Sequence, residues 1–245
     1  MKPKKPRMDV PPTYDKARHD PASQQTQRYG RLALGQYALH PEAFPPSRVI
    51  YYDDKFVVIN DMYPKSTVHL LILPRDKSKN LLGSQSAFGD SEFLADCKRE
   101  KDKVSLMVAD ELRRRFGQYS TAEQARNEAM DAHEPPAELP PGRDWLQGVK
   151  SGIHATPSMD HLHIHVMSKD MVSDSLKNSS HYRSFTTDFF VALEEFPMTT
   201  DEYERKRRSI SEKSMECWRC GQNFGNQLKK LKEHLDEELD AWKRE

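Results

Sequence analysis

A run of alternating histidines and aliphatic residues restricts the local fold more than any other feature of this chain. In "HLHIHVMS", residues 161–168, histidines at 161, 163 and 165 alternate with leucine, isoleucine and valine. Successive side chains of a β-strand point to opposite faces of its sheet. The alternation therefore predicts a strand at 161–168 whose aliphatic side chains enter a core while three imidazoles share the other face.

Further strands and one long helix are predicted around this strand. Residues 145–154 form a second candidate strand, which carries His154 and is joined to the first by a Thr-Pro-Ser turn. Other apolar runs predict strands at 49–52, 56–60 and 68–73, and the spacing of apolar residues predicts a helix over 91–116. Antiparallel pairing of these strands, packed by the helix, gives an α+β fold.

Three imidazoles on one strand face permit three interpretations. A lone histidine is most often a satisfied structural residue, but that role does not explain three in register. Imidazole is a common zinc ligand. A neutral imidazole is also a good nucleophile toward phosphorus near neutral pH. The spacing by itself leaves metal binding and phosphate chemistry both open.

The surrounding segments resemble a known family. "HLHIHVMS" matches the alternating pattern of the histidine-triad (HIT) nucleotide hydrolases and transferases. "DMYPKSTVHLLILPRD", "GIHATPSMDHLHIHVMSKD" and "SLKNSSHYRSFTTDFF" resemble its aprataxin branch, which removes AMP from adenylated DNA 5′ ends. The resemblance covers most of residues 48–240. It implies a HIT-type antiparallel sheet with packed helices, and we expect a HIT catalytic domain at 28–200 with a polar insertion at 117–143.

The resemblance also implies a mechanism. His163 would attack the α-phosphorus of AMP, displace the DNA 5′-phosphate and carry AMP until water releases it. His161 and His165 would orient the phosphate, and His154 would protonate the leaving group. No catalytic metal is expected. The positions that match the family's AMP- and DNA-binding residues are Asp61, Lys65, His69, Ser158, Ser168, Lys177, His181 and Ser184.

A zinc-finger spacing lies near the C-terminus. Cys217 and Cys220 are followed, after thirteen residues, by His234 on a predicted helix. No second histidine follows, but Glu238 lies one helical turn beyond His234, and a carboxylate is an acceptable zinc ligand. Glu237 is the less favoured alternative. We expect one structural zinc ion in a module at 201–245.

The charge distribution suggests a polyanionic partner. The formal net charge is zero, yet nine cations and two glutamates lie between residues 205 and 232. Such a patch suits the phosphates of a DNA end or nick carrying 5′-AMP, with AMP as the product. Two alternatives remain open: a general HIT nucleotide hydrolase acting on AMP-phosphoramidates or dinucleoside polyphosphates, and a non-catalytic zinc-finger DNA-end binder.

Other features concern location and the chain's beginning. Residues 1–27 predict a disordered basic arm, and "KPKKPR" within it suits nuclear import. Three cysteines are too few for a disulfide scaffold, which predicts a reducing compartment. No stretch approaches 18 apolar residues, so no membrane association is expected. In the predicted helix "RLALGQYALHP", Leu34 or Tyr37 could stack on a terminal base pair, although core packing is equally expected for both.

Overall fold

A computed structural model describes residues 30–210 and 214–245. The predicted N-terminal arm, with its basic run, lies outside the described residues. Six strands form one sheet in the order β1-β2-β3-β5-β4-β6, and every neighbouring pair is antiparallel. The strands are β1 (Val49–Tyr52), β2 (Phe56–Asn60), β3 (His69–Pro74), β4 (Val149–His154), β5 (Ile164–Ser168) and β6 (Phe190–Val191).

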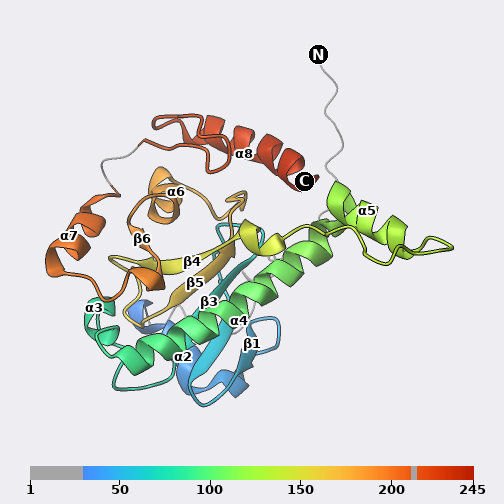
Figure 1. Cartoon of the computed structure of the whole chain (residues 1–245). Helices are drawn as coiled ribbons and strands as arrows, with labels where there is room; N and C mark the ends of the chain where they lie inside the picture. Colours follow the sequence, from blue (N-terminus) through green and yellow to red (C-terminus); the bar gives the residue numbers. More distant parts are fainter. Residues whose placement is uncertain (1–29, 211–213) are drawn as a thin grey trace.

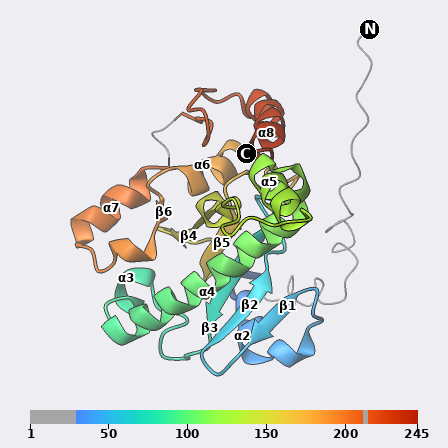
Figure 2. The same ribbon diagram turned by 45° about the vertical axis from the view of Figure 1, so that its right-hand side comes forward.

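Helices surround the sheet (Figures 1 and 2). The α-helices are α2 (Leu34–Leu39), α3 (Ser84–Ala87), α4 (Ser91–Phe116), α5 (Thr121–Met130), α6 (Ser179–Thr186), α7 (Thr200–Arg208) and α8 (Leu228–Trp242). Short 3-10 turns are η2 (Gly30–Leu32), η3 (Pro41–Ala43), η4 (Gly117–Tyr119), η5 (Trp145–Gly148) and η6 (Leu193–Glu195). The predicted α+β class with an antiparallel sheet and packed helices is confirmed.

The long helix α4 crosses one face of the sheet (Figure 1). Asp90 caps it, because its carboxylate accepts hydrogen bonds from the backbone N–H groups of Glu92 and Phe93. The apolar positions that predicted this helix are all buried: Leu94, Cys97, Val104, Val108 and Leu112. They share a core with Ile164 and Val166 of β5, so the aliphatic half of the alternating run faces α4.

The two strands that bear the site histidines start later than the sequence predicts. Strand β5 begins at Ile164, not at residue 161, and β4 begins at Val149 after the turn η5. The ring nitrogens Nδ1 of His161 and His163 bond to nearby backbone carbonyls, and the N–H of Leu162 donates to Asn80. These bonds replace a strand ladder at 161–163, so the first two histidines sit on an irregular approach to β5.

The predicted polar insertion at 117–143 contains helix α5 and touches the core. The Glu123 side chain of α5 is buried, where it accepts hydrogen bonds from Trp145 Nε1 and from the Arg113 guanidinium. A buried carboxylate is tolerated only when it is paired in this way. This segment is therefore packed against the domain rather than merely displayed on its surface.

The C-terminal segment shares a core with the sheet and helix α6. Met167 of β5 and Tyr182 and Phe185 of α6 form one buried cluster with residues of the C-terminal segment. The latter are Met215, Cys217, Phe224, Leu231 and Leu235. Since Met167 and His165 are two residues apart on β5, this cluster lies on the histidine face of the sheet.

The helix α2 packs inward. Leu34 and Tyr37 are buried together against β2 and β3, whereas Leu32 and Leu39 are exposed. Core packing is therefore the role of Leu34 and Tyr37, and neither is free to stack on a base pair. Among the described helices, none combines the length and the apolar character that a bilayer span requires.

Candidate active site and metal site

Three imidazoles gather around that of His165 on the sheet. Its ring centroid lies 4.9 Å from that of His163, 4.7 Å from His154 and 5.1 Å from His69. His154 comes from the end of β4 and His69 from the start of β3, the two strands that pair with β5. The pairing register thus brings together residues almost a hundred positions apart in the chain.

Burial holds these imidazoles in the neutral form. Desolvation lowers the pKa of His163, against weaker opposing effects of a backbone hydrogen bond and of Asp61. The pKa of His154 falls to about 3 and that of His69 to about 4, in both cases mainly through burial. At neutral pH the cluster therefore offers uncharged ring nitrogens, which can act as nucleophiles or as hydrogen-bonding groups.

The hydrogen bonds fix which nitrogen of His163 carries the proton. Its Nδ1 lies 2.7 Å from the carbonyl of His161, and a carbonyl only accepts, so Nδ1 bears the hydrogen. In a neutral ring Nε2 is then the unprotonated atom with an available lone pair. His161 follows the same rule, because its Nδ1 lies 2.9 Å from the carbonyl of Leu162. Its buried Nε2 lacks a hydrogen-bond partner within the described chain.

His165 is held in the opposite tautomer. The backbone N–H of Lys65 donates to His69 Nδ1 at 3.1 Å, which leaves the His69 proton on Nε2. That nitrogen lies 2.9 Å from His165 Nδ1 and 3.5 Å from an Asp61 carboxylate oxygen. His165 therefore accepts at Nδ1 and carries its own proton on Nε2, a buried donor without a partner among the described residues.

Three of the other predicted binding residues are charged or titratable side chains near the histidine cluster, and two are serines on α6 and on the loop between β4 and β5. Lys65, Lys177 and His181 lie close enough to interact electrostatically near the cluster. The hydroxyl of Ser184 on α6 donates to the carbonyl of His181, and Ser158 is exposed on the loop between β4 and β5.

Ser168 does not join them. It is fully buried, and its hydroxyl accepts a hydrogen bond from the backbone N–H of Val68 at 3.1 Å. The hydroxyl thus links β5 to the residue before β3. The assignment of Ser168 to substrate binding stays a prediction.

Phe185 is a site residue that the sequence did not single out. Its ring lies edge to face with His69, His154 and His165, at centroid distances of 5.4, 4.5 and 5.1 Å. It keeps water from one side of the cluster, which contributes to the desolvation of the imidazoles. Only the tertiary contact between α6 and the sheet reveals this role, since the segment "HYRSF" gives no local signal for it.

Part of this histidine cluster also has the composition of a metal-binding site. One oxygen or nitrogen atom each from Asp61, His69 and His165 lies within 4.8 Å of the others. However, His69 Nε2 and His165 Nδ1 already share a hydrogen bond, and these are the nitrogens that a metal would need. The arrangement therefore favours hydrogen bonding within the cluster.

The predicted zinc ligands converge at a separate site. Ligand atoms of Cys217, Cys220, His234 and Glu238 all lie within 4.8 Å of one another. Cys220 Sγ is 3.2 Å from His234 Nε2, which is 3.4 Å from Glu238 Oε1. Two thiolates, an imidazole and a carboxylate are a complete tetrahedral donor set for zinc, with no position left open for substrate. The site is therefore arranged to bind one structural zinc ion.

The structure also decides which glutamate completes this set. Glu238 faces His234, whereas Glu237 is exposed and lies outside the ligand group. Arg219, between the two cysteines, donates from Nη1 to the second oxygen of Glu238 at 2.5 Å. This bond turns the other oxygen toward the metal position, as outer partners of metal ligands commonly do.

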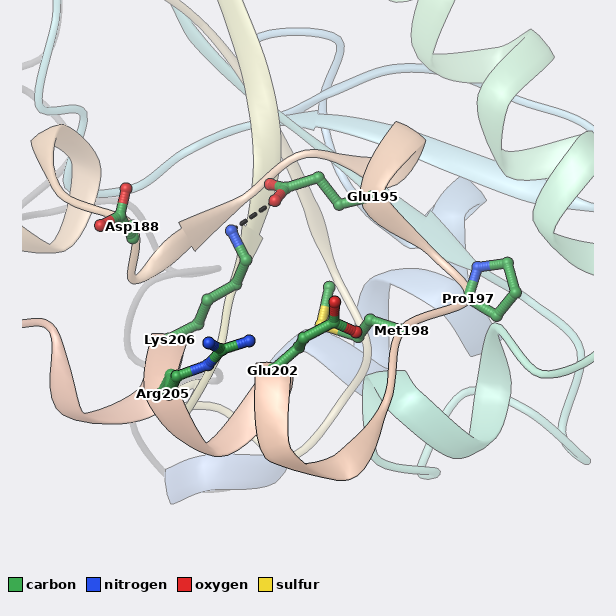
Figure 3. A pocket seen from close by; sticks show the side chains of 7 residues that line it. All are labelled: Asp188, Glu195, Pro197, Met198, Glu202, Arg205 and Lys206. Carbon is green, nitrogen blue, oxygen red and sulfur yellow. Dashed lines mark ion pairs between the residues drawn. The ribbon is translucent and has the colours of Figure 1, made fainter.

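The basic run before the finger is partly used within the protein. Lys206 pairs with Glu195, and Arg207 bonds to Thr156 and Glu204. Figure 3 shows the cleft of about 460 Å³ beside α7, into which Lys206 and Arg205 reach together with three carboxylates. Its mixed charge makes it a poor phosphate site. On α8, Lys229 and Lys230 are exposed, while Lys232 bonds to the Leu176 carbonyl.

The neutral histidines predict a pH-dependent stability. His154 and His69 have folded-state pKa values of about 3 and about 4, below the value of about 6.5 expected on unfolding. Between these limits the unfolded chain binds more protons, so stability is complete above pH 6.5 and falls as the pH drops toward 4. Each group contributes a slope of about 1.4 kcal/mol per pH unit in this window.

Denaturant unfolding at pH 7, 6, 5 and 4 measures that slope. His154→Gln is expected to lower it by one group's share, while the exposed His133→Ala leaves it unchanged. An equal slope in the His154→Gln variant and the parent protein would contradict the assignment of a buried neutral His154.

Comparison with known proteins agrees with this geometry. A family model described as "HIT domain" matches residues 43–172, and one described as "C2HE / C2H2 / C2HC zinc-binding finger" matches 186–241. The aprataxin-like protein of Schizosaccharomyces pombe is 36% identical over 211 residues, which cover 85% of this chain and 81% of the relative. The aprataxin-like protein of Saccharomyces cerevisiae is 34% identical over 220 residues, which cover 86% of this chain and 96% of the relative.

Solved structures of aprataxin orthologs are also similar to this chain. The crystal structure of the aprataxin ortholog Hnt3 from Schizosaccharomyces pombe superposes with a TM-score of 0.66 at 36% identity, covering 85% of this chain and 92% of that one. A structure of aprataxin ortholog Hnt3 in complex with DNA superposes with a TM-score of 0.64 at 33% identity, covering 86% of this chain and 96% of that one. This chain therefore belongs to the aprataxin-like branch of the HIT-domain family.

Proposed function

We propose that this protein is a DNA 5′-adenylate hydrolase, which removes AMP from abortive ligation intermediates during single-strand break repair. The observation that carries the proposal is the state of His163, a buried neutral imidazole whose Nε2 has a free lone pair. Related Hnt3 structures contain DNA, and one contains DNA and guanosine. A DNA-bearing relative and an available nucleophile together favour chemistry on a nucleotide at a DNA end.

The reaction proceeds in two displacements at phosphorus. His163 Nε2 attacks the α-phosphorus of the AMP moiety, a P–N bond forms, and the P–O bond to the DNA 5′-phosphate breaks. Water then attacks the same phosphorus, the P–N bond breaks, and AMP leaves while the imidazole returns to its starting state. Two such steps replace one more difficult displacement.

The neighbouring histidines have separate tasks. His165 presents Nε2–H, a donor suited to a phosphate oxygen in a site that excludes water. His154 and His161 offer buried ring nitrogens. We assign His154 to proton transfer toward the departing DNA phosphate; the anionic phosphates of the bound substrate raise its pKa, so that it takes up the proton that it then donates. Positive charge comes from Lys65 and Lys177, because burial disfavours the charged form of every histidine in the cluster.

The finger supplies DNA affinity in this proposal. Lys229 and Lys230 are exposed on α8, whereas the cleft of about 420 Å³ between α8 and the segment before α6 holds three lysines and three carboxylates. The exposed cations attract phosphates without reading sequence. The remaining residues we assign to AMP and DNA are Asp61, His69, Ser158, His181 and Ser184. A nuclear location suits this function.

A comparison of substrates tests the proposal. Turnover is measured with a nicked duplex carrying 5′-AMP and with the phosphoramidate AMP-lysine. The expected result is a kcat/KM at least about 100-fold higher for the adenylated duplex, equivalent to about 2.7 kcal/mol of additional transition-state binding. A preference for the small phosphoramidate would instead identify a general HIT nucleotide hydrolase, and turnover of neither would identify a DNA-end binder.

A further inference from the structure

All three tryptophans of the chain meet at the last turn of the finger helix α8. Trp242 of α8 lies edge to face with Trp145 at 6.4 Å and with Trp218 at 5.7 Å between ring centroids. Its side chain is buried and belongs to the same core as Leu112 of α4. The end of the finger helix is therefore inserted into the core of the catalytic domain.

A glycine shapes the receiving site. A Cβ atom at Gly148 would lie 2.7 Å from Cζ2 of the Trp242 ring, closer than carbon atoms can approach. Gly148 belongs to η5, directly before β4, where no positive φ requires a glycine. The absence of a side chain at this position gives the indole its room.

The segment 117–143 closes over the same helix end. The Arg143 guanidinium lies 4.2 Å from the Trp145 ring and 4.7 Å from the Trp242 ring, and its Nη1 donates to the Trp242 carbonyl. The backbone N–H of Thr121 donates to the Arg244 carbonyl at 3.0 Å. Because the last carbonyls of a helix lack donors within it, the bond from Arg143 caps α8 from outside, and the bond from Thr121 holds the residues that follow the helix. Figure 2 shows α5 beside the C-terminal end of α8.

Three ion pairs connect this contact to the metal site. Arg219 binds the ligand Glu238 and also Glu245, and the second oxygen of Glu245 lies 3.6 Å from Arg143 Nη2. The fourth zinc ligand is thus linked through Arg219 and Glu245 to the guanidinium that covers Trp242. The finger is also attached at a distant point, where Tyr182 donates to the Glu216 carbonyl.

We propose that Trp145, Gly148, Arg143 and Thr121 form a socket for Trp242 that fixes the orientation of the finger over the histidine site, so that a DNA end bound by the finger reaches His163. The core shared with Tyr182 and Phe185 holds the first part of the finger, and the socket holds the far end of α8, so the two together define the orientation of the finger. The residues of the socket are positioning residues, since none contacts the reacting atoms. This inference rests on the proposed function.

The variant Gly148→Ala tests the socket, with Gly83→Ala as its matched control, because a Cβ at Gly83 meets open space. In Gly148→Ala, the KM for adenylated nicked DNA is expected to rise by about 10-fold with kcat within about twofold, a loss of about 1.4 kcal/mol of binding. AMP-lysine turnover and zinc content are expected to stay unchanged. Near-ultraviolet circular dichroism follows the tryptophan contacts directly.

Trp242→Phe and Trp242→Ala provide a second series, in which phenylalanine should restore most of the DNA KM that alanine loses. Equal losses on DNA and AMP-lysine, or a DNA KM that is unchanged in Gly148→Ala and Trp242→Ala, would overturn the socket. If the parent protein fails on adenylated DNA yet hydrolyses AMP-lysine, the proposed function fails. The socket is then judged by circular dichroism, where unchanged tryptophan signals in Gly148→Ala would refute it.

Discussion

Replacing His163 with alanine is expected to abolish AMP release from adenylated DNA, with a fall in kcat of about 10⁴-fold or more. The reason is chemical, because the variant lacks the atom that attacks phosphorus in the first displacement. DNA affinity should change by less than about threefold, since the basic residues of the finger remain in place. Turnover of a nicked adenylated duplex and fluorescence anisotropy of its binding measure the two quantities separately.

The matched control is His133→Ala, at an exposed position after α5, which should retain full turnover. Acid quenching of the parent protein during turnover should trap one AMP moiety on His163, detectable by mass spectrometry of the proteolysed chain. The mechanism fails if His163→Ala retains substantial turnover, or if the trapped AMP maps to another residue.

Loss of the structural zinc ion is expected to be the most damaging change to the finger. Zinc contributes about 10–16 kcal/mol in isolated zinc-finger peptides, and the core of this finger also includes Tyr182 and Phe185 of α6. Replacing Cys220 with alanine should therefore lower the Tm by on the order of 10 °C and raise the KM for adenylated DNA. Zinc content by atomic absorption, thermal unfolding and turnover on both substrates provide the readouts.

Two adjacent glutamates give this experiment its control. Glu238→Gln should weaken zinc binding in competition with a chromophoric chelator, because it replaces the carboxylate ligand, whereas the exposed Glu237→Gln should bind zinc as the parent does. Equal zinc affinities in the two variants would remove Glu238 from the ligand set. AMP-lysine hydrolysis should suffer less than DNA turnover from zinc loss, because the histidines stay on the sheet.

Local patterns account for the features that the sequence predicted well. The helix expected at 91–116 and the strands at 49–52 and 56–60 have the observed bounds. The signal for the helix is a period of 3.6 residues and the signal for the strands is a short apolar run, and both are properties of a single element. The metal ligands Cys217, Cys220 and His234 also follow from spacing, because a tight turn and one helix suffice to bring them together.

Features that depend on residues far apart in the sequence were predicted less well. The start of β5 was placed three residues too early, because the hydrogen bonds at 161–163 go to Asn80 and to local carbonyls rather than to a neighbouring strand. Ser168 was assigned to substrate binding by resemblance, and its buried hydroxyl accepts a hydrogen bond from the backbone N–H of Val68. Phe185 was not identified at all, since its contacts with three histidines exist only once α6 has packed on the sheet.

The sequence by itself determined that imidazoles would alternate with aliphatic residues at and just before one strand, and that a Cys₂-His-Glu set would form a metal site. The tertiary structure alone decided that Lys65 and His69 fix the tautomer of His165, that Glu238 rather than Glu237 faces the metal, and that Trp242 enters the catalytic core. The difference is physical. Periodicity is a property of a single element, whereas proton positions, ligand choice and sockets depend on atoms that approach only when the whole chain has packed.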